Sequence, residues 1–216
     1  MGFNLSKGER FDLSKAAPGL TKVRIGLGWD PNDQPGGPDF DLDVSAFAID
    51  SKFKIPSDSY FVFYGQVKAG NGIEDETEKG LYRPITEDGS ILGAIDDPDG
   101  KRSDGADDED MIINLGKVNS KIEQIIICVT ICKYPHDNNK DRRTLDLNFG
   151  MVNDCYIRIV NDVTGDEMAK YELKENFGKE DAVEFGRLYR VGGAWEFEAM
   201  GRGHHGSLGE LVNIYT

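Results

Sequence analysis

Acidic and apolar residues alternate in Pro38-Asp39-Phe40-Asp41-Leu42-Asp43-Val44-Ser45-Ala46-Phe47 with the two-residue period of a β-strand. The three aspartates therefore share one face of that strand. The same face continues through Ser45, Phe47 and Ile49, so we expect it to border a hydrophobic core. Along an extended chain the carboxylates lie about 6.5 Å apart, and each neighbouring pair repels by about 2.5 kcal/mol at an effective dielectric of about 20. This repulsion predicts a bound cation.

An alternative for Asp39, Asp41 and Asp43 is an exposed sheet edge whose charges deter aggregation. Edge strands are usually protected by isolated charges, often Lys, and no Lys or Arg is interleaved here. A cage of oxygen ligands for a hard cation is therefore the better interpretation of the three acids.

A second acidic segment directly precedes a predicted strand that begins at Met111, and it reads Asp96-Asp97-Pro98-Asp99-Gly100-Lys101-Arg102-Ser103-Asp104-Gly105-Ala106-Asp107-Asp108-Glu109-Asp110. Its glycines would let carbonyls and carboxylates fold around one point. The segment lacks the register of an EF-hand. Taken alone, it is explained equally well as a solvated surface loop.

The two acidic segments make a stronger hypothesis together. We expect the strand with Asp41, the turn at Asp30 and the loop that ends at Glu109 to meet at one end of the fold. These segments contain no His or Cys, so every side-chain ligand would be oxygen. An all-oxygen site favours Ca²⁺, and Mg²⁺ or Mn²⁺ less well, over zinc or copper.

Strand patterns dominate the rest of the chain and predict an all-β fold, a two-sheet β-sandwich with a few short helices. The pair Gly192-Gly193 separates two alternating segments, which is typical of a two-residue hairpin turn, and Gly165 suits the left-handed position of another. Helix is expected only around 182–185 and at Ser207–Tyr215, where the Ser207 side chain could cap the N-terminus of the helix. The predicted strands lie at 20–29, 38–47, 60–64, 112–115, 122–131, 155–160, 168–173, 187–191 and 194–199.

The chain has 216 residues and a formal net charge of −14. That length suits one large domain, which we expect to span residues 1–216. The negative charge argues against nucleic acid, or an anionic membrane, as a partner bound directly through charge. The longest apolar run, at 125–132, is far short of a membrane span, and the first ten residues do not resemble a signal peptide. We therefore expect no direct membrane insertion, and we read the run at 125–132 as a central strand buried on both faces.

The three cysteines, Cys128, Cys132 and Cys155, form neither a disulfide framework nor a zinc motif. Cys128 and Cys132 would lie about 13 Å apart along one strand, too far to form a bridge. Reduced, buried thiols in a cytoplasmic protein are expected, in preference to a redox or metal-binding role.

Short motifs follow one another along nearly the whole chain: Leu5-Ser6-Lys7-Gly8, Val23-Arg24-Ile25-Gly26-Leu27-Gly28-Trp29-Asp30, Phe40-Asp41-Leu42-Asp43-Val44-Ser45-Ala46-Phe47, Phe61-Val62-Phe63-Tyr64, Asp107-Asp108-Glu109, Asn148-Phe149-Gly150, Tyr156-Ile157-Arg158-Ile159-Val160-Asn161, Phe185-Gly186-Arg187-Leu188-Tyr189-Arg190 and Gly192-Gly193-Ala194-Trp195. In these motifs and their order the chain resembles the TerD-domain proteins of tellurium resistance and general stress response. The resemblance implies a β-sandwich that binds two calcium ions close together at one end, in a cytoplasmic stress protein without known catalysis.

Matching the family's motifs residue by residue gives the candidate metal ligands Asp30, Asp39, Asp41, Asp43, Asp96, Asp104, Asp107, Asp108 and Glu109. No catalytic residue is predicted. The implied partners are calcium ions and other stress or tellurium-resistance proteins, some of them membrane-associated.

Two other functions remain open at this point. A calcium-dependent module for anionic lipids would use the ion as a bridge to head groups, although no exposed apolar or basic loop is evident near the acids. A metal-dependent phosphoesterase would use the same acids, although the sequence has no P-loop and no nucleophile elbow. The neighbouring His204 and His205 are a weaker metal candidate, because adjacent His side chains rarely chelate one ion.

Overall fold

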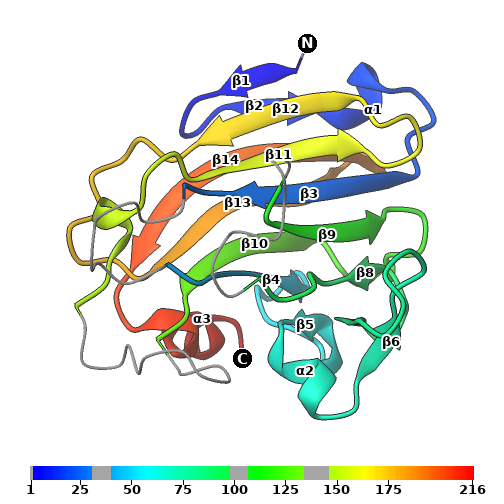
Figure 1. The fold of residues 1–216 in the computed structure, drawn as a ribbon. Helices are drawn as coiled ribbons and strands as arrows, with labels where there is room; N and C mark the ends of the chain where they lie inside the picture. Colours follow the sequence, from blue (N-terminus) through cyan, green and yellow to red (C-terminus); the bar gives the residue numbers. More distant parts are fainter. Residues whose placement is uncertain (1, 31–39, 98–106, 134–145) are drawn as a thin grey trace.

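Two six-stranded β-sheets face each other in a computed structural model, which describes residues 2–30, 40–97, 107–133 and 146–216 (Figure 1). The first sheet has the order β1 (Phe3–Leu5), β12 (Glu167–Glu172), β11 (Tyr156–Asn161), β3 (Lys22–Gly28), β9 (Glu109–Asn114) and β8 (Ile91–Leu92). The second has the order β2 (Arg10–Asp12), β14 (Ala194–His204), β13 (Ala182–Val191), β10 (Gln124–Ile131), β4 (Leu42–Ile49) and β5 (Phe61–Val62). The predicted all-β sandwich is confirmed.

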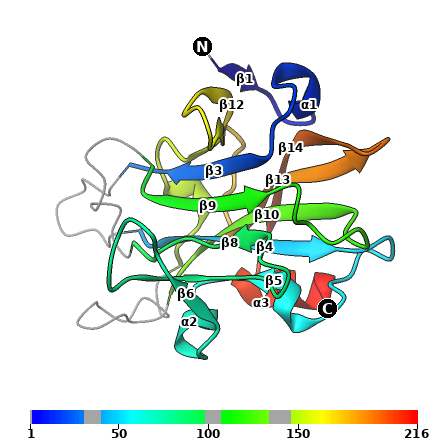
Figure 2. The same ribbon diagram turned by 90° about the vertical axis from the view of Figure 1, so that its right-hand side faces the viewer.

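The remaining elements are short and lie outside the two sheets (Figure 2). They are the hairpin β6 (Gly72–Glu74) and β7 (Tyr82–Pro84), the α-helices α1 (Leu13–Ala16), α2 (Gly65–Lys68) and α3 (Ser207–Tyr215), and the 3₁₀ helices η1 (Asp58–Tyr60) and η2 (Phe149–Met151). The C-terminal helix α3 is therefore confirmed. None of the helices in the described ranges is long and apolar enough to cross a membrane.

Strand β4 has two buried faces that belong to two different cores. Leu42, Val44, Ala46 and Ala48 contribute to the main core between the sheets. The opposite face, which carries Phe47 and Ile49, packs in a smaller core with Leu211 and Tyr215 of α3. The face that carries the aspartates is thus buried as expected, but it borders the core beneath α3 rather than the one between the sheets.

Strand β10 lies in the middle of the second sheet, between β13 and β4, and is buried on both faces as predicted. Its register with β4 pairs Thr130 with Asp43, and the backbone N–H of Cys132 donates to the carbonyl of Asp41. Because directly opposed residues point to the same side of a sheet, Cys132 shares the face of the aspartates.

Three local predictions need correction. Residues 182–185 are not helical but begin β13, where all four are buried, so no polar alternation marks them as a strand. Ser207 does not cap α3, because the capping residue is Gly206 and the carboxylate of Asp181 accepts the N–H groups of Gly206 and Ser207. The strand expected at 60–64 is limited to Phe61–Val62. Gly165, Gly192 and Gly193 do adopt positive φ, as their turns require.

Candidate metal centre

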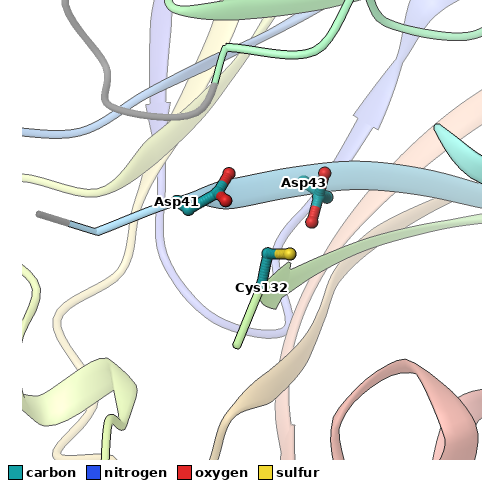
Figure 3. Close-up of side chains that lie close together, drawn as sticks. All are labelled: Asp41, Asp43 and Cys132. Carbon is teal, nitrogen blue, oxygen red and sulfur yellow. The ribbon is translucent and has the colours of Figure 1, made fainter. Parts of the chain in front are cut away.

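Two of the three alternating aspartates, Asp41 and Asp43, belong to the described residues, and both are almost completely buried. Asp41 is 0% exposed and Asp43 is 2% exposed. Asp41 directly precedes β4 and Asp43 is the second residue of that strand. The sulfur of Cys132, which directly follows β10, extends toward Asp43 (Figure 3). This burial rules out the alternative of an exposed, charge-protected edge for these two residues.

Glu109 joins the first sheet to this end of the second. It is the first residue of β9, and the alternation of that strand points it into the sandwich. Its Oε2 accepts the Val44 N–H at 2.8 Å, and its Oε1 accepts the Asp97 N–H at 3.3 Å. The backbone groups of the odd-numbered residues of β4 form the hydrogen bonds to β10, so the N–H of Val44 points away from β10. Glu109 thus supplies the acceptor that a neighbouring strand would otherwise provide.

Two overlapping clusters of possible ligands result. Potential ligand atoms of Asp43, Asp96 and Glu109 all lie within 4.8 Å of one another, and so do those of Asp41, Asp43 and Cys132. We call the first the oxygen cluster and the second the thiol cluster. Asp43 belongs to both and therefore lies between them.

Asp43 is the most unusual side chain of the site. Both of its carboxylate oxygens are buried, and no N–H or O–H group of the described residues donates to either one. The Cys132 thiol also faces it and favours its charged form. Burying an ionised carboxylate in such a place destabilises the folded protein by several kcal/mol, unless a cation binds to it. Without a cation, the group avoids this cost by taking up a proton. This observation, rather than the number of acids, points to a ligand.

The electrostatics of the metal-free cluster agree with that reasoning. Burial, followed by the charges of Asp41 and Asp96, raises the pKa of Asp43 well above its usual value, and Lys68 offsets only part of the effect. Burial and then the charge of Asp43 likewise raise the pKa of Glu109. Without a cation, Asp43 and Glu109 thus reduce the repulsion by retaining protons. A bound divalent cation would take the place of those protons.

The oxygen cluster fits Ca²⁺ in chemistry and in size. Oxygen ligands bind Ca²⁺ at about 2.3–2.6 Å, so two oxygens on one ion can be at most about 5.2 Å apart. The three carboxylates lie within 4.8 Å of one another and meet that limit without rearrangement of the backbone. Of the predicted ligands, Asp41, Asp43, Asp96 and Glu109 are therefore brought together.

The other predicted ligands are placed differently. Asp108 lies beside them in sequence, but its Oδ2 accepts the Trp29 N–H at 2.9 Å. Asp30 is exposed, and its N–H donates to the carbonyl of Asn153. Asp39 and Asp104 lie outside the described residues.

Asp107 lies on the outer face of the first sheet. Its Oδ1 accepts from Arg158 Nε at 2.7 Å and from the Tyr156 hydroxyl at 3.3 Å. A Cβ at Gly26 would collide with the Asp107 carboxylate, so this arrangement requires glycine there. Within the described ranges Asp107 belongs to neither cluster. The structure thus separates Asp107 from Glu109, although both were predicted as ligands.

Sequence reasoning missed two residues at this site. Cys132 was expected to be an inert buried thiol. It is indeed buried and forms no disulfide, yet its Sγ lies in the thiol cluster. Asp97 is 1% exposed and positions Glu109 through its backbone N–H. The pairing of Cys132 with Asp41 depends on the register between two distant strands, for which the sequence carries no signal.

The chain is similar to known proteins along its whole length. Residues 1–215 match the family model described as the TerD domain. General stress protein 16U of Bacillus subtilis (strain 168) is 37% identical over 215 residues, covering 100% of this chain and 97% of the relative. The tellurium resistance protein TerD of Serratia marcescens is 39% identical, again covering 100% of this chain and 97% of the relative.

Solved structures show the same fold at lower identity. A homologue of the telluride resistance protein (TerD) from Streptomyces coelicolor A3(2) superposes with a TM-score of 0.63 at 20% identity, covering 90% of this chain and 96% of the other. A protein of unknown function superposes with a TM-score of 0.65 at 22% identity, covering 92% of this chain and 99% of the other. With the family model matched over nearly its whole length, this chain belongs to the TerD domain family.

Proposed function

We propose that this protein is a non-enzymatic, calcium-binding stress-response protein that holds two Ca²⁺ ions at the acidic end of its sandwich. Stress response and tellurium resistance are the roles given in the names of its relatives. The proposal places the protein in the cytoplasm. Its partners would be other stress or tellurium-resistance proteins, some of them membrane-associated, which dock on the metal-bearing end.

The observation that carries this proposal is the environment of Asp43. A carboxylate that is 2% exposed, with no N–H or O–H donor among the described residues, lies within 4.8 Å of two further carboxylates. Such a group is strongly destabilising as an anion unless a cation binds it. In this proposal the first Ca²⁺ bridges Asp43, Asp96 and Glu109. The second binds on the other side of Asp43, with Asp41 as its nearest further acid.

Calorimetric titration of metal-stripped protein with Ca²⁺ tests the proposal. We expect a binding isotherm, and free Ca²⁺ at about a hundred times the dissociation constant should add about 2.7 kcal/mol to the free energy of unfolding. The variant Asp43→Asn keeps the size of the side chain and removes its charge, so it should fold and lose the isotherm. Asp58→Asn is the matched control, since Asp58 is an exposed acid on the short helix η1.

No heat of binding at millimolar Ca²⁺, or an unchanged isotherm in Asp43→Asn, contradicts the proposal. Loss of the isotherm in Asp58→Asn would also count against it, because that result would reflect general charge rather than a built site.

A further inference from the structure

The acidic end of the sandwich has two chemically different sides. In the oxygen cluster Asp43 meets two carboxylates, whereas in the thiol cluster it meets one carboxylate and the sulfur of Cys132. Divalent cations respond to this difference, because carboxylate oxygen suits hard ions such as Ca²⁺ and thiolate sulfur suits borderline or soft ions such as Zn²⁺ and Cd²⁺.

We propose that Asp41, Asp43 and Cys132 form a binding site for a borderline or soft divalent cation, with the Cys132 Sγ as a thiolate ligand. The site extends the proposed calcium centre, with which it shares Asp43 as the bridging carboxylate. This side of Asp43 is where the proposed function places the second Ca²⁺, and we expect Zn²⁺ or Cd²⁺ to bind there more tightly than Ca²⁺.

Register and burial hold the three side chains together. Cys132 pairs with Asp41 through its backbone N–H, which places its side chain diagonally next to Asp43 on the same sheet face. Figure 3 shows the sulfur directed toward the Asp43 carboxylate. Cys132 is 5% exposed and both aspartates are less exposed still, so the ligands are fixed by packing rather than by a loop.

The environment of Asp43 is a separate observation that points to a ligand here. A cysteine beside an acid could be a chance neighbour if the acid were solvated or hydrogen-bonded. Asp43 is 2% exposed and receives no N–H or O–H donor from the described residues. Its oxygens therefore face a position that a cation could occupy.

The dimensions suit such an ion. Zn²⁺ binds sulfur at about 2.3 Å and carboxylate oxygen at about 2.0–2.2 Å, so two ligands in a tetrahedral site lie about 3.6 Å apart. The three ligand atoms lie within 4.8 Å of one another. Side-chain rotations that move these atoms by about 1 Å would bring them to the spacing that Zn²⁺ requires. The larger Cd²⁺ needs less closure.

A cavity gives the site access and room for water. It has a volume of about 170 Å³, and its lining includes Asp43, Tyr64, Thr130, Cys132, Lys133 and the start of α3. This volume can hold a few waters, each of about 30 Å³ in the liquid, so a bound cation can complete its shell with solvent. Binding releases the thiol proton of Cys132 to solvent as the metal–sulfur bond forms, and no electron is transferred.

Cd²⁺ titration of the reduced, metal-stripped, full-length protein tests the inference. Thiolate coordination produces a charge-transfer band in the ultraviolet, which we expect in the wild type. Cys132→Ser should lose the band and bind Cd²⁺ at least about tenfold more weakly, while its Ca²⁺ isotherm stays unchanged in the oxygen cluster. Cys155→Ser is the matched control, because Cys155 is an equally buried thiol of the main core.

A second measurement needs no variant. Zn²⁺ should slow the alkylation of Cys132 in the wild type, as followed by peptide mass mapping, and should leave Cys128 and Cys155 unaffected. Slowed alkylation of all three thiols would indicate global stabilisation and would overturn the assignment of Cys132.

The outcomes separate this inference from the calcium proposal. A wild type that binds Ca²⁺ but shows no Cd²⁺ band, or a band that persists in Cys132→Ser, overturns the inference and leaves the calcium site standing. A Cd²⁺ band that depends on Cys132, in a protein that gives no Ca²⁺ heat, supports the inference and overturns the calcium proposal.

Discussion

The Oε2 of Glu109 accepts the backbone N–H of Val44 at 2.8 Å and so ties β9 of the first sheet to β4 of the second. Glu109 is 3% exposed, and the same carboxylate also accepts the Asp97 N–H. One side chain therefore satisfies two backbone donors and contributes to the oxygen cluster. Structural and metal-binding roles coincide in it, and substitutions can separate them.

Replacing Glu109 should affect stability even without metal. Glu109→Ala removes the acceptor for two backbone N–H groups, and each buried donor left unpaired costs about 1–3 kcal/mol. We expect urea unfolding of the metal-free protein to show a loss of about 3 kcal/mol. Glu109→Gln keeps one carbonyl acceptor and should lose about 1 kcal/mol. Equal losses in the two variants would mean that side-chain volume, rather than hydrogen bonding, is what Glu109 provides.

The stability of the metal-free protein should fall as pH rises above about 4. The pKa values of Asp43 and Glu109 are raised by burial and by neighbouring acids, so the folded state retains protons that the unfolded chain has released. Their contribution is most favourable below the unfolded pKa of about 4 and is lost as pH rises through the higher folded values. Melting temperatures measured across pH with chelator should show this decline.

Saturating Ca²⁺ should remove that pH dependence, because the ion compensates the charges that the protons neutralised. Asp43→Asn should flatten the profile in chelator for the same reason. A decline of equal slope in Asp43→Asn would assign the effect to acids elsewhere in the chain.

The side chains that share a face of β4 could be predicted, because a strand alternates its faces residue by residue. The alternation of Asp41 and Asp43 with Leu42 and Val44 was therefore sufficient to place the acids together. The same pattern does not reveal which face lies between the sheets. Both faces of β4 are buried. That α3 covers one of them depends on tertiary packing, which the alternation within a strand does not report.

Pairing between distant segments could not be predicted. Cys132 joins the acids only because β10 pairs with β4 in one particular register. Likewise, consecutive acids before β9 diverge, because Glu109 enters the sandwich while Asp107 turns outward to Arg158. The triplet Asp107-Asp108-Glu109 predicts that metal ligands are present, but it does not predict which of its three side chains points into the sandwich.

Arg83 should anchor the β6–β7 hairpin to the first sheet. Its side chain is 7% exposed and donates to Asp75 through Nε, and to the Asp110 carboxylate at 2.8 Å and the Gly93 carbonyl at 3.1 Å. Removing one partner of a buried ion pair costs about 3–5 kcal/mol. Arg83→Met should lower the free energy of unfolding by about that amount and speed hydrogen exchange in the hairpin first.

The exposed Arg10 provides the control for this experiment, since its ion pair with Glu198 is mostly solvated. Arg10→Met should change stability by less than about 1 kcal/mol. If the hairpin exchanges no faster in Arg83→Met than in Arg10→Met, the anchoring role of Arg83 is wrong.

Asp181 should control access to Cys132 through α3. Its Oδ1 accepts the N–H groups of Gly206 and Ser207 at 2.9 and 2.8 Å, and its Oδ2 accepts from Lys133 Nζ at 2.8 Å. Although burial alone would raise the pKa of Asp181, these donors hold it below its usual value, so the carboxylate stays charged and keeps α3 docked.

The start of α3 lines the cavity beside Cys132, so releasing that end of the helix should expose the thiol. Asp181→Ala leaves two helix N–H groups without their acceptor, and we expect a loss of about 2 kcal/mol and faster alkylation of Cys132. Asp181→Asn retains a carbonyl acceptor for both N–H groups and should give an intermediate rate. An alkylation rate that is unchanged in Asp181→Ala, despite a measurable loss of stability, would show that solvent reaches Cys132 by a route that does not involve α3.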